Sequence, residues 1–162
     1  YFRIDLPEKN YTRYTSECPF EFDVPTYSQV VVNTSYPKER CWLNLEFPSL
    51  KATLHLSYKD VDGNASALMD ESYMMAYKHS VKANGIRDRM YTDEENRVFG
   101  MLYSISGNSA SSLQFAMTDS SKHFLRGSLY FYAIPNADSL APVLDFVTAD
   151  VDRMISSLRW KN

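Results

Sequence analysis

The sequence contains no apolar run that approaches the roughly 18 to 20 residues needed to cross a bilayer, and no signal-peptide pattern opens it. It also has no block of five or more basic residues, and its 17 basic and 20 acidic residues leave a formal net charge of −3. A nucleic-acid partner is not expected, because a phosphate backbone requires a concentrated positive surface. No repeat, linker or low-complexity stretch interrupts the chain, so we expect a single globular domain over residues 1–162.

The chain is also poor in residues that bind metals. Its three histidines, His55, His79 and His123, are scattered, and none has a cysteine or another histidine at the short spacing of a zinc site. We therefore expect no metal and no cofactor. The two cysteines, Cys18 and Cys41, are the only ones. In an oxidising compartment they would form one disulfide, worth roughly 3 kcal/mol for a loop of this length, whereas in the cytosol they would be two buried thiols.

The stretch TDSSKHFLRGSLYF, residues 118–131, holds the residue types of a nucleophilic triad. A serine hydrolase needs a base within reach of its nucleophile and donors for the oxyanion, and no G-x-S-x-G turn surrounds these serines. We expect no catalytic residues. Asp119 and Ser120 instead predict a turn held by side-chain to backbone hydrogen bonds, and His123→Ala should leave the fold nearly intact. The alternative is that His123 and Arg126, with Tyr130, contact a partner or an anionic ligand.

Most of the remaining chain has the pattern of half-buried strands. Apolar and polar residues alternate, as on a strand with one apolar face, in residues 41–47, 51–58 and 112–118. Two further segments are apolar on both sides, residues 97–105 and 124–133. Two weaker strand candidates are residues 28–34 and 1–7.

Two segments have the spacing of amphipathic helices. In residues 65–83, Met74, Tyr77 and Val81 are expected to face the core, and Met69, Met75 and Met90 are also expected to fill it. The C-terminal segment repeats apolar residues three and four positions apart: Leu140, Leu144, Val147, Val151, Met154 or Ile155, and Leu158.

Strands joined mostly by short turns favour an antiparallel sheet, and two amphipathic helices must bury their apolar sides against it. The expected fold class is therefore α+β, a mainly antiparallel β-sheet packed by two principal helices. The order of sheet and terminal helix is also similar to the Mog1/PsbP-like fold, an α/β/α sandwich.

The polar sides of the strands supply candidate contact residues. His55 and Gln114 alternate away from apolar neighbours, where they would line a shallow groove or simply be solvated or covered by a helix. Trp42 stands on the polar side of its strand, where a large aromatic residue lowers solubility unless something covers it. The candidate surface for a partner or ligand comprises Trp42, His55, Gln114, His123, Arg126 and Tyr130.

Several long blocks resemble, in order, the gliding-motility lipoprotein GldD family of Bacteroidota. The blocks are CWLNLEFPSLKATLHLSYK, EENRVFGMLYSISGNSASSLQF, TDSSKHFLRGSLYFYAIPNADSLAP and DVDRMISSLRWK. This resemblance implies a signal peptide and an acylated cysteine upstream of Tyr1, and a lipid-anchored, periplasm-facing place in the cell envelope. It implies no enzyme activity and no catalytic residues.

Two functions remain open at this point. The first is a non-enzymatic envelope lipoprotein, an accessory or assembly component of a gliding-motility or secretion complex that acts through contacts with envelope proteins. The second is a periplasmic module that binds a small ligand or lipid between sheet and helix. A concave apolar pocket would favour the second, and a flat patch around Trp42 or Arg126 would favour the first.

Overall fold

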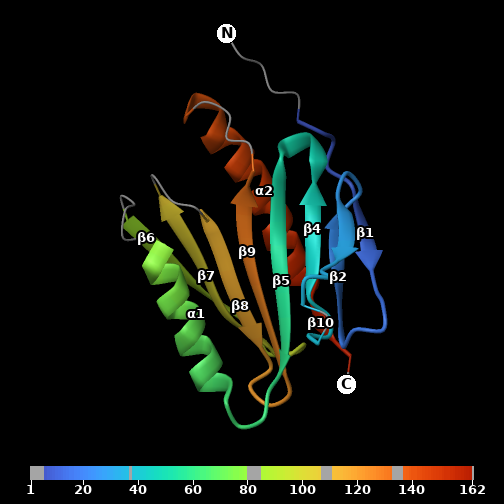
Figure 1. Cartoon of the computed structure of the whole chain (residues 1–162), viewed down its shortest axis with the longest axis vertical. Coiled ribbons are helices and arrows are strands. Elements are labelled where there is room, and N and C mark those ends of the chain that lie inside the picture. Colours follow the sequence, from blue (N-terminus) through green and yellow to red (C-terminus); the bar gives the residue numbers. More distant parts are fainter. Residues whose placement is uncertain (1–5, 37, 80–84, 107–110, 133–136, 162) are drawn as a thin grey trace.

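The centre of the molecule is a seven-stranded antiparallel sheet with the strand order β3-β4-β5-β9-β8-β7-β6 (Figure 1). The computed structural model describes residues 6–36, 38–79, 85–106, 111–132 and 137–161. The strands of this sheet are β3 (Gln29–Val32), β4 (Leu43–Phe47), β5 (Ala52–Asp60), β6 (Gly85–Asp93), β7 (Val98–Ser106), β8 (Leu113–Thr118) and β9 (His123–Phe131). Six of these strands lie in segments that the sequence analysis predicts as strands, and β6 is the exception.

A smaller three-stranded sheet, of order β1-β2-β10, contains strands that the sequence analysis does not predict. Its members are β1 (Tyr11–Tyr14), β2 (Phe20–Pro25) and β10 (Arg159–Trp160). β2 does alternate between buried and half-buried residues, but prolines stand immediately before it and at its end, and proline is a weak strand former. Of the strand expected at residues 1–7, residues 1–5 lie outside the described part, and Leu6 and Pro7 belong to no strand.

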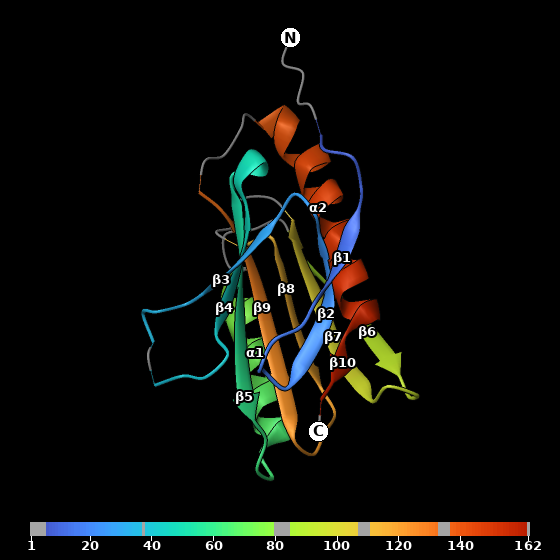
Figure 2. The same cartoon turned by 90° about the vertical axis from the view of Figure 1, so that its right-hand side faces the viewer.

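The helices lie on opposite faces of the large sheet (Figure 2). Helix α1 (Ala65–His79) packs on β7, β8 and β9, whereas α2 (Ala137–Ser157) packs on β2. A short 3-10 helix, η1 (Pro48–Leu50), links β4 to β5. The arrangement confirms the predicted α+β class with an antiparallel sheet and two principal helices.

The main core lies between the large sheet, α2 and β2. It combines Phe20 and Phe22 of β2 with the apolar sides of β4, β5, β8 and β9. Phe115 lies directly over its cross-strand neighbour Gly127, where an added Cβ would come within 2.2 Å of the ring. The helix contributes Val143, Val147, Val151, Met154 and Ile155, and Leu158 follows directly after it.

The predicted helix faces need two corrections. In α2, Leu144 is only half-buried and Val143 takes the buried position. In α1 the predicted face is wrong, because Met74 and Tyr77 are 66% and 53% exposed. Val81 lies outside the described residues.

The residues of α1 that do face the sheet are Leu68, Ser72 and Ala76. They are spaced four apart, so they share one side of the helix. Two of them are small, which allows the helix to approach the sheet closely, and the Ser72 hydroxyl donates to the carbonyl oxygen of Leu68 at 3.0 Å. Size, and not only hydrophobicity, therefore decides which side of α1 is buried.

Candidate functional site

The large sheet is covered unequally on the α1 side. α1 contacts β7, β8 and β9, so β4 and β5 present their polar sides beside it (Figure 1). Cross-strand polar pairs cover this part: the Thr53 hydroxyl donates to the Glu46 carboxylate at 2.6 Å, and His55 Nδ1 lies 2.9 Å from Asn44 Oδ1. The sheet therefore has an open, polar area next to the helix.

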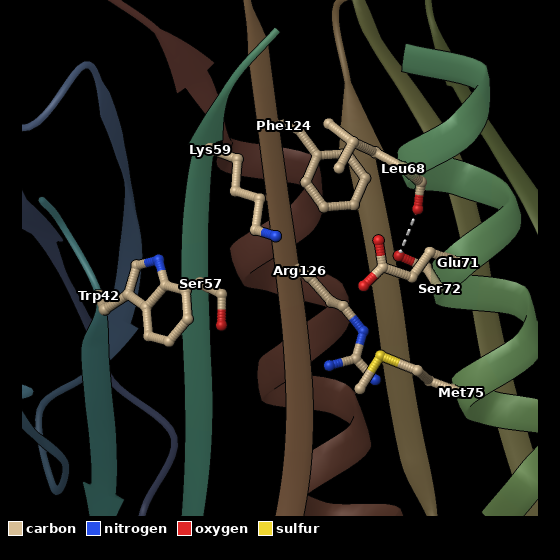
Figure 3. A pocket seen from close by; sticks show the side chains of 9 residues that line it. All are labelled: Trp42, Ser57, Lys59, Leu68, Glu71, Ser72, Met75, Phe124 and Arg126. Atoms are coloured by element: carbon tan, nitrogen blue, oxygen red, sulfur yellow. Dashed lines mark hydrogen bonds between the residues drawn. The ribbon is translucent and has the colours of Figure 1, made fainter. Parts of the chain in front are cut away.

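A hollow of about 160 Å³ lies between this area and α1 (Figure 3). We call it the α1 groove. Its lining residues are Trp42, Ser57, Lys59, Leu68, Glu71, Ser72, Met75, Phe124 and Arg126.

Strand alternation explains which side chains form the floor of the α1 groove. Ser57 pairs across the strands with Arg126, and Lys59 pairs with Phe124. These four residues point away from the core because their neighbours Tyr58 and Leu125 point into it. The groove thus brings Trp42 and Arg126, which are far apart in the sequence, to one place.

Trp42 forms the wall of the groove opposite α1 (Figure 3). Its indole Nε1 donates to the backbone oxygen of Tyr58 at 3.0 Å, and its ring centroid lies 4.7 Å from that of Tyr36. A half-buried indole held at two points is a rigid apolar surface.

Arg126 lies half-buried on the groove floor. Burial lowers its pKa, while Tyr130 and Glu71 act in the opposite direction. Its Nη2 donates to the Gln114 side-chain oxygen at 2.9 Å. Among the described residues, no carboxylate lies within ion-pair distance of Arg126, and none lies within that distance of Lys59.

Gln114 and Ser128 lie beside Arg126 but are buried beneath the surface, at 1% and 4% exposed. They are cross-strand neighbours on β8 and β9. Within the described part of the chain, the Gln114 Nε2 and the Ser128 Oγ have no hydrogen-bond partner. The sequence places Gln114 among surface candidates, and the structure corrects this because α1 covers β8.

His55 and Tyr130 lie further along the same face, where they contact each other edge to face with ring centroids 5.5 Å apart. His55 is exposed and Tyr130 is half-buried. Five of the six candidate residues therefore belong to one face of the sheet.

The sixth candidate, His123, lies on the opposite face and is 4% exposed. Its Nδ1 lies 2.7 Å from the Tyr58 hydroxyl, and its ring stacks on Trp160 at 5.1 Å. Burial lowers the pKa of His123, although Asp119 and Asp60 raise it. The expectation that His123→Ala leaves the fold nearly intact assumes an exposed side chain, so we now expect this substitution to be destabilising.

The turn before His123 is held by Asp119. One carboxylate oxygen, Oδ1, accepts backbone N–H groups of Ser121, Lys122 and His123 at 2.8 to 3.0 Å. Burial would raise the pKa of Asp119, but these hydrogen bonds lower it overall. Within the described residues no serine hydroxyl bonds to His123, so residue types that suggest a triad build a turn instead.

An exposed apolar patch lies on the outer side of α1, and the sequence analysis misses it. The α1 outer patch consists of Tyr73, Met74, Met75 and Tyr77, of which Met75 also lines the α1 groove. Met90 of the edge strand β6 is exposed as well, at 75%. The expectation that Met74, Met75 and Met90 fill the core is wrong. The helix turns Ser72 and Ala76 toward the sheet in place of its methionines, and Met90 lies exposed on the edge strand β6. Exposed methionine and tyrosine side chains are typical of adaptable protein-binding surfaces.

A buried charge cluster on the other side of the molecule also escapes sequence analysis. Asp150 of α2 is 1% exposed and accepts hydrogen bonds from Lys9 Nζ and the Tyr11 hydroxyl, both at 2.7 Å, and from the Tyr27 hydroxyl. Lys9 also lies over the ring of Phe146, 3.3 Å from its centroid. Burial, followed by the bond to Asp150, raises the pKa of Tyr11 to about 12. These residues are too far apart in the sequence for spacing to reveal them.

Cys18 and Cys41 form a disulfide with a Cα–Cα distance of 5.7 Å. Cys18 packs in the main core, and Cys41 directly precedes Trp42. The bridge therefore ties the wall of the α1 groove to the start of β2.

Comparison with known proteins gives a family for this arrangement. The family model described as gliding motility lipoprotein GldD matches residues 1–160. The chain belongs to this family. It is accordingly a gliding-motility lipoprotein by family, associated with the cell envelope as part of a gliding-motility apparatus. No curated protein matches the sequence.

The fold also has a solved counterpart. The solution structure of cyanobacterial PsbP (CyanoP) from Synechocystis sp. PCC 6803 is similar with a TM-score of 0.57, over 96% of this chain and 95% of that one. The two sequences are 12% identical, so the likeness concerns the fold alone. It confirms the predicted PsbP-like architecture.

None of the described helices is both long and apolar enough to span a bilayer. The described residues contain no group of three or more histidine, cysteine, aspartate or glutamate side chains placed to hold a metal ion.

Proposed function

We propose that this chain is a non-enzymatic accessory or assembly subunit of a gliding-motility or secretion complex, and that it acts as one globular domain through protein contacts on the α1 side of the sheet. The observation that carries the proposal is the meeting of Trp42 and Arg126 in the α1 groove, directly beside the exposed α1 outer patch. Tryptophan, tyrosine, methionine and arginine are the residue types enriched in protein interfaces.

The expected place of the protein follows from its family. We propose that an acylated N-terminal cysteine upstream of Tyr1 anchors the domain, and that the domain faces the periplasm. The Cys18–Cys41 disulfide supports this location. Disulfides persist in oxidising compartments such as the periplasm and are reduced in the cytosol.

Binding of a lipid or another drug-sized ligand in the α1 groove is less well supported. Sites for such ligands usually have volumes of roughly 300 to 1,000 Å³, whereas this hollow measures about 160 Å³ and has Lys59, Glu71 and Arg126 in its lining. Larger hollows, of about 430 and 500 Å³, lie at the two ends of the sheet, and they too have charged residues in their lining. The groove is better suited to one side chain of a partner protein.

The test is site-specific photocrosslinking of the full-length, lipidated protein in cells. A photoreactive residue at Ser57 in the groove or at Met74 on the α1 outer patch should capture the same envelope protein. The matched control places it at Ala149, an exposed position of α2, where that protein should not be captured. The double substitution Trp42→Ala, Arg126→Ala should abolish the product.

Two results would contradict the proposal. Equal capture from Ala149 would show that the α1 side has no special role. Absence of any protein product, together with a small molecule that co-purifies in native mass spectrometry, would favour the ligand-binding module.

A further inference from the structure

Arg126 is a half-buried cation that has no counter-ion among the described residues. Its guanidinium donates a hydrogen bond to the neutral side-chain oxygen of Gln114, and no described carboxylate lies within ion-pair distance of it. Moving a charge away from water is costly unless an opposite charge and hydrogen bonds compensate it. The remaining donors of the guanidinium are therefore available for an acceptor from outside the chain.

Two polar groups next to Arg126 also lack a hydrogen-bond partner among the described residues. The Gln114 Nε2 belongs to the amide whose oxygen contacts Arg126, so it lies next to the guanidinium. It is buried without a partner, and so is the Ser128 hydroxyl across the strand pair. Buried polar groups are almost always hydrogen-bonded. Neither residue lines the α1 groove, so an acceptor that enters the groove would contact Arg126 and leave these two groups beneath it.

The charges of the α1 groove favour an anion. Lys59 and Arg126 lie on the floor and Glu71 on the wall (Figure 3), which leaves one net positive charge. Glu71 is the acidic residue that most influences Arg126, but it makes no ion pair with it. A carboxylate that enters the groove would pair directly with Arg126, whereas Glu71 attracts the guanidinium from a greater distance.

Apolar surfaces flank the cations. Trp42 stands on one side, and Leu68, Met75 and Phe124 lie on the other side and on the floor. A cavity of roughly 150 Å³ accommodates one benzene molecule, so a hollow of about 160 Å³ has room for one aromatic side chain.

Building on the proposed function, we infer that the α1 groove binds a segment of the partner protein in which a carboxylate adjoins an aromatic side chain. The carboxylate pairs with Arg126 and lies near Lys59, and the aromatic ring packs between Trp42 and Met75. A bidentate arginine–carboxylate pair fixes the orientation of such a segment.

The first experiment is an NMR titration of the chain with N-acetyl-phenylalanine, which carries both groups. N-acetyl-phenylalaninamide is the matched control, because it lacks only the charge. The Trp42 indole N–H and the Met75 methyl group report on the groove. The acid should bind about tenfold more tightly than the amide, or more, because hydrogen bonds to charged groups are the strong ones.

Substitutions assign this preference to its residue. Arg126→Gln retains a donor near Gln114, so it should fold, with a Tm within about 4 °C of wild type. It should abolish the preference for the acid. Arg87→Gln removes the same charge from an exposed site on β6 and should retain the preference.

Several outcomes would overturn the inference. They are equal binding of acid and amide, shifts outside the groove, or a preference that survives in Arg126→Gln. A partner crosslinked at Ser57 without any acid preference would retain the proposed docking function and remove only the carboxylate site. An acid preference without a crosslinked protein would retain a carboxylate site but refute its assignment to a protein segment, favouring a small anionic ligand.

Discussion

On one face of the seven-stranded sheet, α2 and the small sheet bury a continuous layer of leucine, valine and phenylalanine side chains. On the other face, α1 covers only β7 to β9 and leaves polar pairs, the α1 groove and the α1 outer patch accessible. Both faces come from the same strands, whose residues alternate between them. The difference separates the side of the sheet that carries the main core from the side on which we propose that a partner binds.

The two faces also differ in how their buried polar groups are satisfied. On the α2 side the buried charge Asp150 has three hydrogen-bond donors. On the α1 side Gln114 and Ser128 each leave an atom without a hydrogen-bond partner among the described residues.

The largest effect should come from a charge placed in the α2 core. Val151→Asp puts an unpaired carboxylate at a site that is 1% exposed, and we expect a loss of about 4 kcal/mol or more in the free energy of unfolding. Urea denaturation measures this. Ala149→Asp puts the same charge on an exposed position of the same helix and should change stability by less than about 0.5 kcal/mol. Comparable losses for both variants would contradict the assigned helix face.

Removal of the buried carboxylate should have the next largest effect. Asp150→Ala leaves Lys9 and two tyrosine hydroxyls without their acceptor, which should cost about 3 kcal/mol. The control is Asp152→Ala, because Asp152 forms an exposed ion pair with Arg89 at 2.7 Å and should lose at most about 1 kcal/mol. If the two substitutions were equally mild in thermal melts, the cluster would not hold the N-terminal segment.

The disulfide should contribute about as much as the carboxylate cluster. Cys18→Ser with Cys41→Ser is expected to lose roughly 3 kcal/mol, measured by denaturant unfolding. A reducing agent should destabilise the wild type by a similar amount and leave the double variant unchanged. A wild type insensitive to reduction would show that the bridge adds nothing to the connection between β2 and Trp42.

A smaller effect should appear on mild acidification. The pKa of His123 is lowered in the folded chain, so the unfolded chain takes up a proton first as the pH falls below about 6.5. Stability is therefore complete above that pH and decreases below it. His123→Phe should remove this dependence between about pH 7 and pH 5.5, whereas His55→Gln should keep it. A dependence unchanged in His123→Phe would have to arise elsewhere.

The smallest change in stability, with the largest change in function, is expected at the α1 outer patch. Met74 is 66% exposed, so Met74→Glu should alter the free energy of unfolding by less than about 0.5 kcal/mol while it prevents crosslinking to the partner. Ala149→Glu, equally mild in thermal melts, should leave the crosslink intact. Normal crosslinking of Met74→Glu would exclude the patch from the interface.

The sequence predicts those parts of the fold in which polarity alternates clearly. β4, β5 and β8 follow from period-2 patterns, and α2 follows from its apolar repeat. β6 escapes prediction because it is an edge strand whose residues are exposed or half-buried on both sides, so no apolar period marks it. β10 is only two residues long.

The candidate site is predictable only as far as the alternation of side chains along each strand assigns residues to a face of the sheet. Strand parity places Trp42, His55 and Arg126 on the polar side of the sheet. It gives no information on which part of that side α1 covers, and the outcome depends on the small residues Ser72 and Ala76. Gln114 is consequently buried and the α1 methionines are exposed. His123 lies at the end of β9, where the packing of Trp160 from the far end of the chain decides its environment.

The buried charge cluster around Asp150 has a mechanical consequence. Lys9, which precedes β1, and Tyr11, the first residue of β1, contact the middle of α2, and β1 continues antiparallel along β2. Tension that enters along residues 6–9 would load an ion pair and a row of strand hydrogen bonds before it reached the large sheet. This force would pass into α2 and the small sheet, which lie on the side away from the α1 groove. The surface proposed to bind a partner would therefore keep its shape while the domain is pulled from its N-terminal side.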